Sequence, residues 1–515
     1  MRNNIGQFIT KRASLNPNTE AIVDIGTGRR LTYPELNARC NQIAHALVAG
    51  GMSKGDRIAT LLMNGPEFVE TFFGAAKVGG VTVALNWRLV ADELSFILTD
   101  SGASTMIFGS AFNEVVTELH ERGTDGTQVK RWIHVGDAAN CPEFAENYDD
   151  VIASGSSDEP DVDSGDDDLL FIMYTSGTTG LPKGAMHSHS TALWSVITGN
   201  TTADTRYDDR YLICLPLFHV GALNPLLSIV NLGGTAVIMS EFDPVRIWEV
   251  FGEEKVSVTL AVPAMLQFML LTFDADKHDI SHLRWIMSGA SPVPETLIKT
   301  YDSMGIEVHQ VYGLTETCGP ACLISPEDAI SRAGSTGKAF FYTQVRVVNE
   351  AGDNCKPDEP GEVLVAGPHI MLGYWNRPEA TAETVVDGWL KTGDIATVDE
   401  DGFVYIQDRV KDMIISGGEN VYPAEIENVI LSLDGVNEVA VIGVPSEKWG
   451  ESPLAVVVRG DESLTADAVL AHCDGKLAKF KQPKAVEFTD VIPRNPTGKV
   501  LKRILRDTYD EVTVN

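Results

Sequence analysis

Several features that would assign the chain to a special class are missing from its 515 residues. No apolar run approaches the roughly 20 residues that a membrane-spanning helix requires. The first twenty residues contain neither a continuous apolar stretch nor a small-residue cleavage site, so a secretory signal peptide is not expected. We therefore expect a cytoplasmic protein without an integral membrane segment.

Cysteines are few and are not arranged in pairs. The seven thiols are scattered along the chain, which favours reduced cysteines over a disulfide framework. Cys318 and Cys322 are the nearest pair, but no second pair accompanies them. A metal site built from cysteines is therefore not expected.

Positive charge is also scarce. The chain has 40 Lys and Arg against 72 Asp and Glu, which gives a formal net charge of −32. Such a protein should be soluble and should repel nucleic acid and anionic membranes. An acidic chain can still hold a local basic pocket for a small anionic substrate. The oligomeric state stays open at this stage, with a homodimer among the options.

The order of helical and strand patterns predicts an α/β fold. The chain is too long for one ordinary core, so two or more domains are expected. Strand-like runs alternate with amphipathic helices such as residues 33–51 and 66–80, which is typical of largely parallel sheets. We predict a large N-terminal domain over residues 1–410. We predict a small mobile α+β domain over residues 411–515. The strands are expected within residues 56–64, 81–86, 104–109, 131–136, 168–177, 210–219, 235–240, 258–263, 283–291 and 307–317.

Residues 142–168 carry many acids and no Lys or Arg. This composition predicts a flexible or poorly packed connector rather than a binding site.

The segment YTSGTTGLPKG, residues 174–184, combines glycines, hydroxyls and a lysine directly after an apolar strand. Glycines allow successive backbone N–H groups to converge on one anion, and Lys183 adds a mobile cation. The Walker-type loop places Ser or Thr after its lysine to hold Mg²⁺, whereas Gly184 follows Lys183 here. The loop therefore predicts a phosphate site of a different kind.

The segment resembles the phosphate loop of the adenylate-forming superfamily, which includes acyl- and aryl-CoA synthetases, peptide-synthetase adenylation domains and beetle luciferases. Further motifs resemble that family in the same order along essentially the whole chain. Those motifs are LPLFHVGAL (215–223), VYGLTET (311–317), GWLKTGD (388–394), DRVKDMIISGGENVYPAEIE (408–427) and NPTGKVLK (495–502). The block KDMIISGGENVYPAEIE (411–427) is most similar to that of bacterial fatty-acid–CoA ligases.

The resemblance implies a reaction in two halves, with ATP, Mg²⁺ and coenzyme A as cofactors. A carboxylate attacks the α-phosphate of ATP to give an acyl-adenylate and pyrophosphate, and a thiol then displaces AMP. Such chemistry depends mainly on positioning and charge neutralisation.

The resemblance also implies a set of nucleotide-binding residues. Glu316 and Thr175 are expected to hold Mg²⁺, which typically takes one or two protein oxygens plus phosphates. Thr315 is expected beside the α-phosphate, and Asp394 on the ribose hydroxyls. The full ATP-binding set is Thr175, Ser176, Gly177, Thr178, Thr179, Lys183, Gly289, Ala290, Ser291, Tyr312, Gly313, Leu314, Asp394 and Arg409.

The resemblance also implies three functions for residues of the expected C-terminal domain. Lys499 matches the adenylation lysine, and Lys411 matches the hinge about which the family's small domain rotates. Gly417 and Gly418 are expected to approach the pantetheine of coenzyme A.

The acid substrate is expected to be apolar. His219 resembles the family's gate beside the acyl-adenylate, although a structural histidine remains an alternative. The expected pocket residues offer no cation for a second carboxylate, which favours a monocarboxylic apolar acid. A medium- or long-chain fatty acid is the first expectation and a cinnamate- or benzoate-like aryl acid the second, since apolar walls suit either. A carrier-protein thiol, an oxidase of the luciferase type and a noncatalytic nucleotide-binding protein remain alternatives. The pocket residues are Trp194, Phe218, Val220, Leu223 and Met287, with the segment around Ala321 beside them.

Overall fold

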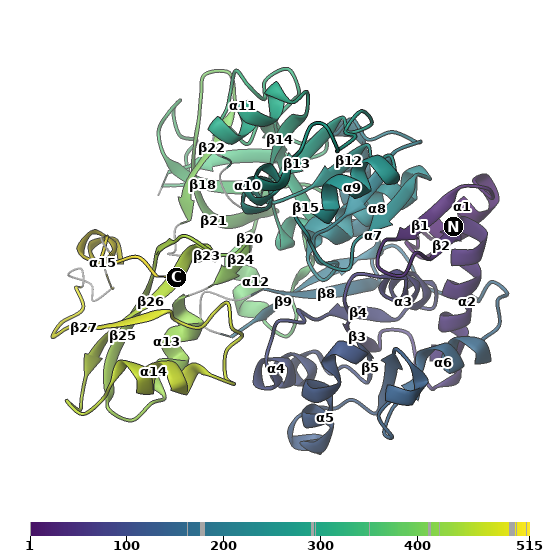
Figure 1. Cartoon of the computed structure of the whole chain (residues 1–515), viewed down its shortest axis with the longest axis horizontal. Coiled ribbons are helices and arrows are strands. Elements are labelled where there is room, and N and C mark those ends of the chain that lie inside the picture. Colours follow the sequence, from purple (N-terminus) through teal and green to yellow (C-terminus); the bar gives the residue numbers. More distant parts are fainter. Residues whose placement is uncertain are drawn as a thin grey trace. The chain divides into compact units, whose positions relative to one another are not determined.

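Two large β-sheets contain most of the strands in the computed structural model (Figure 1). The structure describes every residue except 1, 162, 176–180, 290–292, 294, 350, 410–413, 422, 494–499, 501, 511 and 515. Contacts divide the chain into two compact units. The first comprises Met1–Trp87, Leu98–Tyr174 and Gly184–Gln407, and the second Arg88–Ile97, Thr175–Lys183 and Asp408–Asn515. Among the described residues, no helix is both long enough and apolar enough to cross a membrane.

The first large sheet has nine strands, of which six consecutive neighbours run parallel. Its antiparallel members lie at the two edges. In spatial order the strands are β16 (Lys338–Ala339), β15 (Gly319–Leu323), β14 (Glu307–Leu314), β13 (Trp285–Ser288), β12 (Val258–Leu260), β10 (Arg210–Ile213), β11 (Thr235–Ile238), β1 (Glu20–Asp24) and β2 (Arg30–Thr32).

The second large sheet has eight strands and is parallel across its centre. The order is β19 (Gly373–Tyr374), β9 (Lys183–Ser188), β8 (Leu169–Thr175), β4 (Val81–Ala84), β3 (Arg57–Leu61), β5 (Thr105–Gly109), β6 (Arg131–Val135) and β7 (Glu146–Asn147). Each strand region expected from the sequence contains a strand, so the α/β prediction is confirmed.

A buried apolar cluster joins the two large sheets through the helices between them. Apolar side chains from both sheets belong to this one cluster, which explains why the central strands are apolar on both faces. The shared helices are α1 (Gln7–Leu15), α2 (Tyr33–Ala49), α3 (Pro66–Lys77), α7 (His189–Thr202) and α8 (Val220–Leu232). A second cluster covers the other face of the nine-stranded sheet with α9 (Arg246–Glu253), α10 (Pro263–Thr272) and α11 (Glu295–Ser303). The remaining helices of this region are α4 (Ala91–Ser101), α5 (Asn113–Glu121), α6 (Tyr148–Ser154) and α12 (Pro378–Thr384).

A third sheet is antiparallel, which the strand–helix alternation of the sequence did not predict. Its order is β17 (Gln344–Val348), β18 (Gly361–Ala366), β21 (Trp389–Val398) and β20 (Val385–Val386), with β22 (Val404–Arg409) paired to β21. Alternating buried and partly exposed positions along β18 show that it covers the core with one face only.

The second unit contains a mixed sheet. The order is β24 (Glu419–Val421), β23 (Ile414–Ser416), β26 (Gly450–Arg459) and β25 (Val436–Ser446), with β27 (Ala485–Phe488) parallel to β26. Helices α13 (Pro423–Leu431) and α14 (Ala466–Cys473) form one apolar cluster with this sheet. Helix α15 (Lys502–Thr508) contributes to a second apolar cluster with the same sheet. This α+β composition agrees with the sequence-based expectation, while Lys411, the expected first residue of the domain, lies outside the described residues.

The prediction that residues 142–168 pack poorly is wrong. Within this segment, the Tyr148 hydroxyl donates to Glu70 Oε2 at 3.0 Å. Glu159 accepts from Lys77 Nζ at 2.9 Å, and Lys77 is fully buried. The acidic composition was misleading because the basic partners of these carboxylates come from distant helices.

The Lys77 ammonium also donates to three side-chain oxygens of α1 and α2. The distances are 2.7 Å to Thr10 Oγ1, 2.7 Å to Asn37 Oδ1 and 2.6 Å to Asn41 Oδ1. A buried ammonium requires such complete hydrogen bonding. Lys77 therefore joins the first three helices to the acidic segment.

We expect Lys77→Met to destabilise the fold by about 1–3 kcal/mol, because it leaves buried amide oxygens without their donor. The urea midpoint followed by tryptophan fluorescence measures this loss. The exposed Lys130 provides the control: Lys130→Met should leave the midpoint unchanged. Equal midpoints for the Lys77→Met and Lys130→Met proteins would contradict the proposed role of the cluster.

Candidate active site

The VYGLTET motif lies where the chain reverses between β14 and β15. Gly313 is required at this reversal, because a Cβ on it would lie 1.6 Å from the Gly319 carbonyl oxygen. Cys318 completes the reversal in the left-handed region, with φ of 54°. Thr315 and Glu316 therefore occupy the turn itself, at the carboxyl end of β14, where α/β sheets commonly bind ligands.

Tyr312 and Asp394 are brought together from distant parts of the sequence. The Tyr312 hydroxyl donates to Asp394 Oδ2 at 2.6 Å, and Asp394 is almost completely buried. Burial, reinforced by the Asp394 carboxylate, holds the pKa of Tyr312 well above its usual value, so the phenol remains a donor. A carboxylate has about four acceptor positions and can therefore accept several hydrogen bonds at once.

Three hydrogen bonds hold the Thr315–Glu316 turn. His187 Nε2 is 2.8 Å from the Thr315 carbonyl oxygen, and the Met371 N–H donates to the Glu316 carbonyl oxygen at 2.8 Å. Burial lowers the pKa of His187 to about 4, so the ring is neutral near pH 7 and carries its proton on Nε2. The Tyr374 hydroxyl donates to Glu316 Oε1 at 2.7 Å. Sequence reasoning missed His187, Met371 and Tyr374, because only the fold brings them to the turn.

The structure describes the predicted phosphate loop only on either side of residues 176–180. Thr175 ends β8 and Lys183 begins β9, and the Thr175 hydroxyl donates to the Lys183 carbonyl oxygen at 3.4 Å. Gly184 is required after the lysine, because a Cβ on it would lie 2.5 Å from Ile172 Cγ2. The other predicted loop residues, Ser176, Gly177, Thr178 and Thr179, lie outside the described residues.

The predicted adenine-facing backbone follows β13. A Cβ on Gly289 would lie 2.4 Å from the Val311 carbonyl oxygen, so glycine allows this segment to approach β14 closely. Leu314, the last residue of β14, is buried. Ala290 and Ser291 lie outside the described residues.

Four of the five predicted pocket residues belong to one apolar region. Phe218, Leu223 and Met287 are buried in the cluster between the large sheets, and Val220 packs against it from the start of α8. Trp194 is half-buried, and its ring packs edge-on against Tyr342 with the ring centroids 5.3 Å apart. The role of Trp194 in the pocket stays a prediction.

Sequence reasoning missed three further apolar residues in this region. Leu215, Leu260 and Val311 are only partly buried and pack against the same cluster. Leu260 is paired in register with Met287, so their side chains share one face of the sheet. Apolar residues at the ends of successive predicted strands were the available signal.

His219 is the residue before α8, and its ring lies 4.4 Å from that of Phe218. Trp87 packs edge-on against Phe218 at 6.2 Å. The rings of Trp87, Phe218 and the predicted gate residue His219 therefore pack one against the next.

The residues predicted to act from the second unit are described only in part. Gly417 and Gly418 have φ of 61° and 81°, and a Cβ on Gly417 would lie 2.7 Å from the Trp449 ring. Arg409 is the last residue of β22. Lys411 and Lys499 lie outside the described residues, so their roles stay predictions.

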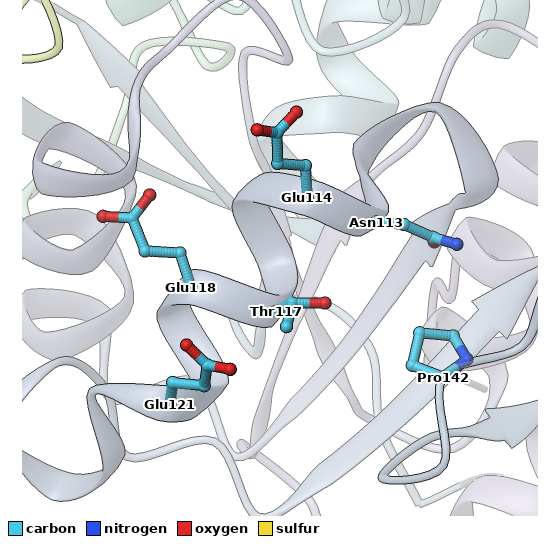
Figure 2. Close-up of a pocket in the computed structure, with 6 residues that line it drawn as sticks. All are labelled: Asn113, Glu114, Thr117, Glu118, Glu121 and Pro142. Atoms are coloured by element: carbon cyan, nitrogen blue, oxygen red, sulfur yellow. The ribbon is translucent and has the colours of Figure 1, made fainter.

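A surface hollow of about 510 Å³ contains none of the predicted site residues. Its lining residues are Pro142 and the α5 residues Asn113, Glu114, Thr117, Glu118 and Glu121, and Figure 2 shows Pro142 on a loop beside the helix. Its charged lining residues are Glu114, Glu118 and Glu121. Three carboxylates without a cation among the lining residues would repel a nucleotide or an acid substrate.

A family model described as AMP-binding enzyme matches residues 9–375, and its C-terminal domain model matches residues 425–499. The chain belongs to this family. The long-chain-fatty-acid–CoA ligase FadD13 of Mycobacterium tuberculosis is 44% identical to it over 506 residues, or 98% of each chain. A feruloyl-CoA synthase of an Amycolatopsis species is 40% identical over 512 residues, 99% of this chain and 100% of that one.

Similarity extends to the three-dimensional structure. The solved structure of a Mycobacterium tuberculosis fatty acyl CoA synthetase covers 99% of this chain and 99% of its own, with a TM-score of 0.76 and 43% identity. The protein is therefore an AMP-forming acyl-CoA synthetase, an ATP-dependent acid–thiol ligase with the fold expected from its motifs.

Below pH 6.5 we expect His369 to make the fold less stable. Burial lowers the pKa of His369 to about 4, while an unfolded histidine titrates near 6.5. As pH falls between these values, the unfolded chain takes up a proton that the folded chain excludes. At pH 5 this uptake lowers the free energy of unfolding by about 2 kcal/mol, relative to a pH at which the histidine is neutral in both states.

The variant His369→Gln keeps a side-chain donor for the Pro320 carbonyl oxygen, which His369 Nε2 contacts at 3.0 Å, but it cannot titrate. Its urea stability should therefore fall less between pH 7 and pH 5 than that of the unaltered protein. His282 is exposed to solvent, and His282→Gln serves as the control. Parallel stability curves for the unaltered protein and the His369→Gln variant would disprove the expected linkage.

Proposed function

We propose that this protein activates a medium- or long-chain fatty acid and transfers it to coenzyme A. In the first half-reaction a carboxylate oxygen bonds to the α-phosphorus of ATP, and the bond to the bridging oxygen breaks to release pyrophosphate. In the second half-reaction the thiol sulfur, after losing its proton, bonds to the acyl carbon and AMP leaves.

The apolar cluster at the strand ends carries the substrate proposal. Phe218, Val220, Leu223 and Met287 offer only apolar contacts, and the partly buried Leu260 and Val311 extend this lining. Such walls suit an alkyl chain, whose burial contributes about 0.8 kcal/mol per methylene group. An amino acid or a dicarboxylic acid would require a charged partner for its second ionised group, and none of these six residues carries a charge.

An aryl acid remains the second candidate. The feruloyl-CoA synthase is similar over nearly the whole chain, and apolar walls also accommodate an aromatic ring. A carrier-protein thiol is the alternative acceptor to coenzyme A.

The ATP site is proposed from the residues at the ends of β14 and β21. Tyr312 would contact the adenine while Asp394 accepts hydrogen bonds from the ribose hydroxyls, and Thr315 would lie beside the α-phosphate. Thr175 and Lys183 would hold the pyrophosphate group together with the loop between them. Arg409 would contact the ribose or a phosphate.

Glu316 fits a Mg²⁺ ligand because its carboxylate is partly exposed. Among the described residues, only Tyr374 bonds this carboxylate, and it does so through Oε1. Glu316 and Thr175 would hold the ion. When bound, Mg²⁺ neutralises charge on the phosphates.

We assign the adenylation lysine to Lys499 and the hinge to Lys411. Lys499 would bridge the carboxylate and the α-phosphate as negative charge develops between them. Rotation about Lys411 would then bring Gly417 and Gly418 to the pantetheine, while His219 opens the path to the acyl-adenylate.

A cytoplasmic location is part of the proposal, as is the absence of a nucleic-acid partner. The formal net charge of −32 would repel phosphodiester backbones. A homodimer remains compatible with the proposal, which requires only one chain for the site.

Acid-dependent pyrophosphate release tests the substrate proposal. With ATP, Mg²⁺ and coenzyme A, we expect laurate and palmitate to give higher kcat/KM than octanoate, ferulate or benzoate. Omitting coenzyme A should limit release to about one turnover per enzyme, because the acyl-adenylate remains bound. Higher kcat/KM with ferulate would favour the aryl-acid candidate, and turnover only with an acyl carrier protein would reassign the thiol.

Lys499→Ala should lower adenylate formation by about 100-fold or more, the usual effect of removing one group that stabilises developing charge. Conversion of a supplied acyl-adenylate to the thioester should stay near the unaltered rate, because the lysine acts only in the first half-reaction. Pyrophosphate exchange and thioester formation measure the two halves separately. Equal losses in both would refute the assignment of Lys499. Lys130→Ala removes an exposed lysine outside the predicted site and serves as the control.

A further inference from the structure

The Glu316 carboxylate is held from one side by a tyrosine far along the sequence. The Tyr374 hydroxyl donates to Glu316 Oε1 at 2.7 Å, while the Met371 N–H fixes the Glu316 carbonyl oxygen. The backbone and one carboxylate oxygen of Glu316 are thus both bonded to the segment Met371–Tyr374. Oε2 is the carboxylate oxygen that this segment leaves for a ligand.

Tyr374 is itself fixed in place. Its N–H donates to Thr381 Oγ1 at 2.9 Å, and its side chain is buried with Ala185, Met371 and Leu390. It also pairs with Ala185 across β9 and β19. A phenol held by backbone pairing and apolar packing orients its hydroxyl without losing rotamer freedom when a ligand binds.

The same segment holds the strand that leaves the phosphate loop. The Leu372 N–H donates to the Met186 carbonyl oxygen at 2.9 Å, and the Trp375 N–H donates to the Gly184 carbonyl oxygen at 2.7 Å. Gly184 directly follows Lys183 in the loop motif. Residues 371–375 therefore bond both to the start of β9 and to the Glu316 turn.

We propose that Tyr374 is a positioning residue for the Mg²⁺ of MgATP, acting through Glu316. Its hydroxyl occupies Oε1 and so presents Oε2 of Glu316 as the metal ligand, in an orientation set before ATP binds. A group that orients a metal-binding carboxylate typically changes metal affinity by 10–100-fold when it is removed. This inference rests on the proposed role of Glu316.

The test is the coupling between Mg²⁺ and ATP binding, measured by calorimetry without any acid substrate. The dissociation constant of ATP is determined in EDTA and at saturating Mg²⁺, and the ratio of the two is the coupling. Tyr374→Phe should reduce this ratio by roughly 10-fold, with little change in the EDTA value. The Mg²⁺ concentration for half-maximal pyrophosphate release should rise by a similar factor, with kcat recovered at high Mg²⁺.

Tyr33→Phe is the matched control. Tyr33 is fully buried and its hydroxyl donates to the Gly234 carbonyl oxygen at 2.7 Å, so its removal costs one buried hydrogen bond away from Glu316. This variant should keep the unaltered coupling ratio. Thermal unfolding of both variants shows whether they fold, and Tyr374→Leu provides a second removal of the hydroxyl.

Two failures are distinguishable. An unchanged coupling ratio in both Tyr374 variants, with acid-dependent pyrophosphate release intact in the unaltered protein, overturns the role of Tyr374 alone. Equal loss of coupling in Tyr374→Phe and Tyr33→Phe also overturns it, because the effect would then follow any buried hydroxyl. No acid-dependent release by the unaltered protein would instead overturn the proposed function.

Discussion

The close approach of Gly313 to the Gly319 carbonyl oxygen sets the geometry on which the candidate site depends. A side chain at Gly313 would separate β14 from β15, and the turn that carries Thr315 and Glu316 could not close. With the strands in contact, hydrogen bonds from His187 and Met371 can reach the two carbonyl oxygens of the turn. A steric constraint at one glycine thus determines where the Glu316 carboxylate lies.

Buried polar groups around this turn are paired before any substrate is present. Tyr312 is bonded to Asp394, and Tyr374 is bonded to Glu316. In both pairs a phenol donates to one oxygen of a carboxylate and so fixes the orientation of that carboxylate. Preorganised groups of this kind reduce the reorganisation that binding and reaction would otherwise require. The arrangement therefore suits a reaction that depends on charge placement rather than on a nucleophilic side chain.

The acidic composition of the chain coexists with a few cations placed at buried positions. Lys77 is enclosed by side-chain oxygens, and Glu70 is fully buried against Arg29 at 2.7 Å. Removing one partner from such a group leaves an uncompensated charge or acceptor in a medium of low polarity. These clusters connect helices that are distant in sequence, which explains why a segment without any Lys or Arg is nevertheless well packed.

The sequence by itself determined the α/β class, the strand regions and the order of the family motifs, because periodicity and glycine positions are local properties. It also predicted roles for Tyr312, Asp394, Thr315 and Glu316, and these roles stay predictions. The tertiary structure alone decided which residues meet: Tyr374 and His187 reach the Glu316 turn from outside its motif, and Trp194 packs edge-on against Tyr342. Such contacts depend on how strands and helices from distant segments pack. Composition and local spacing predict individual elements but not this packing.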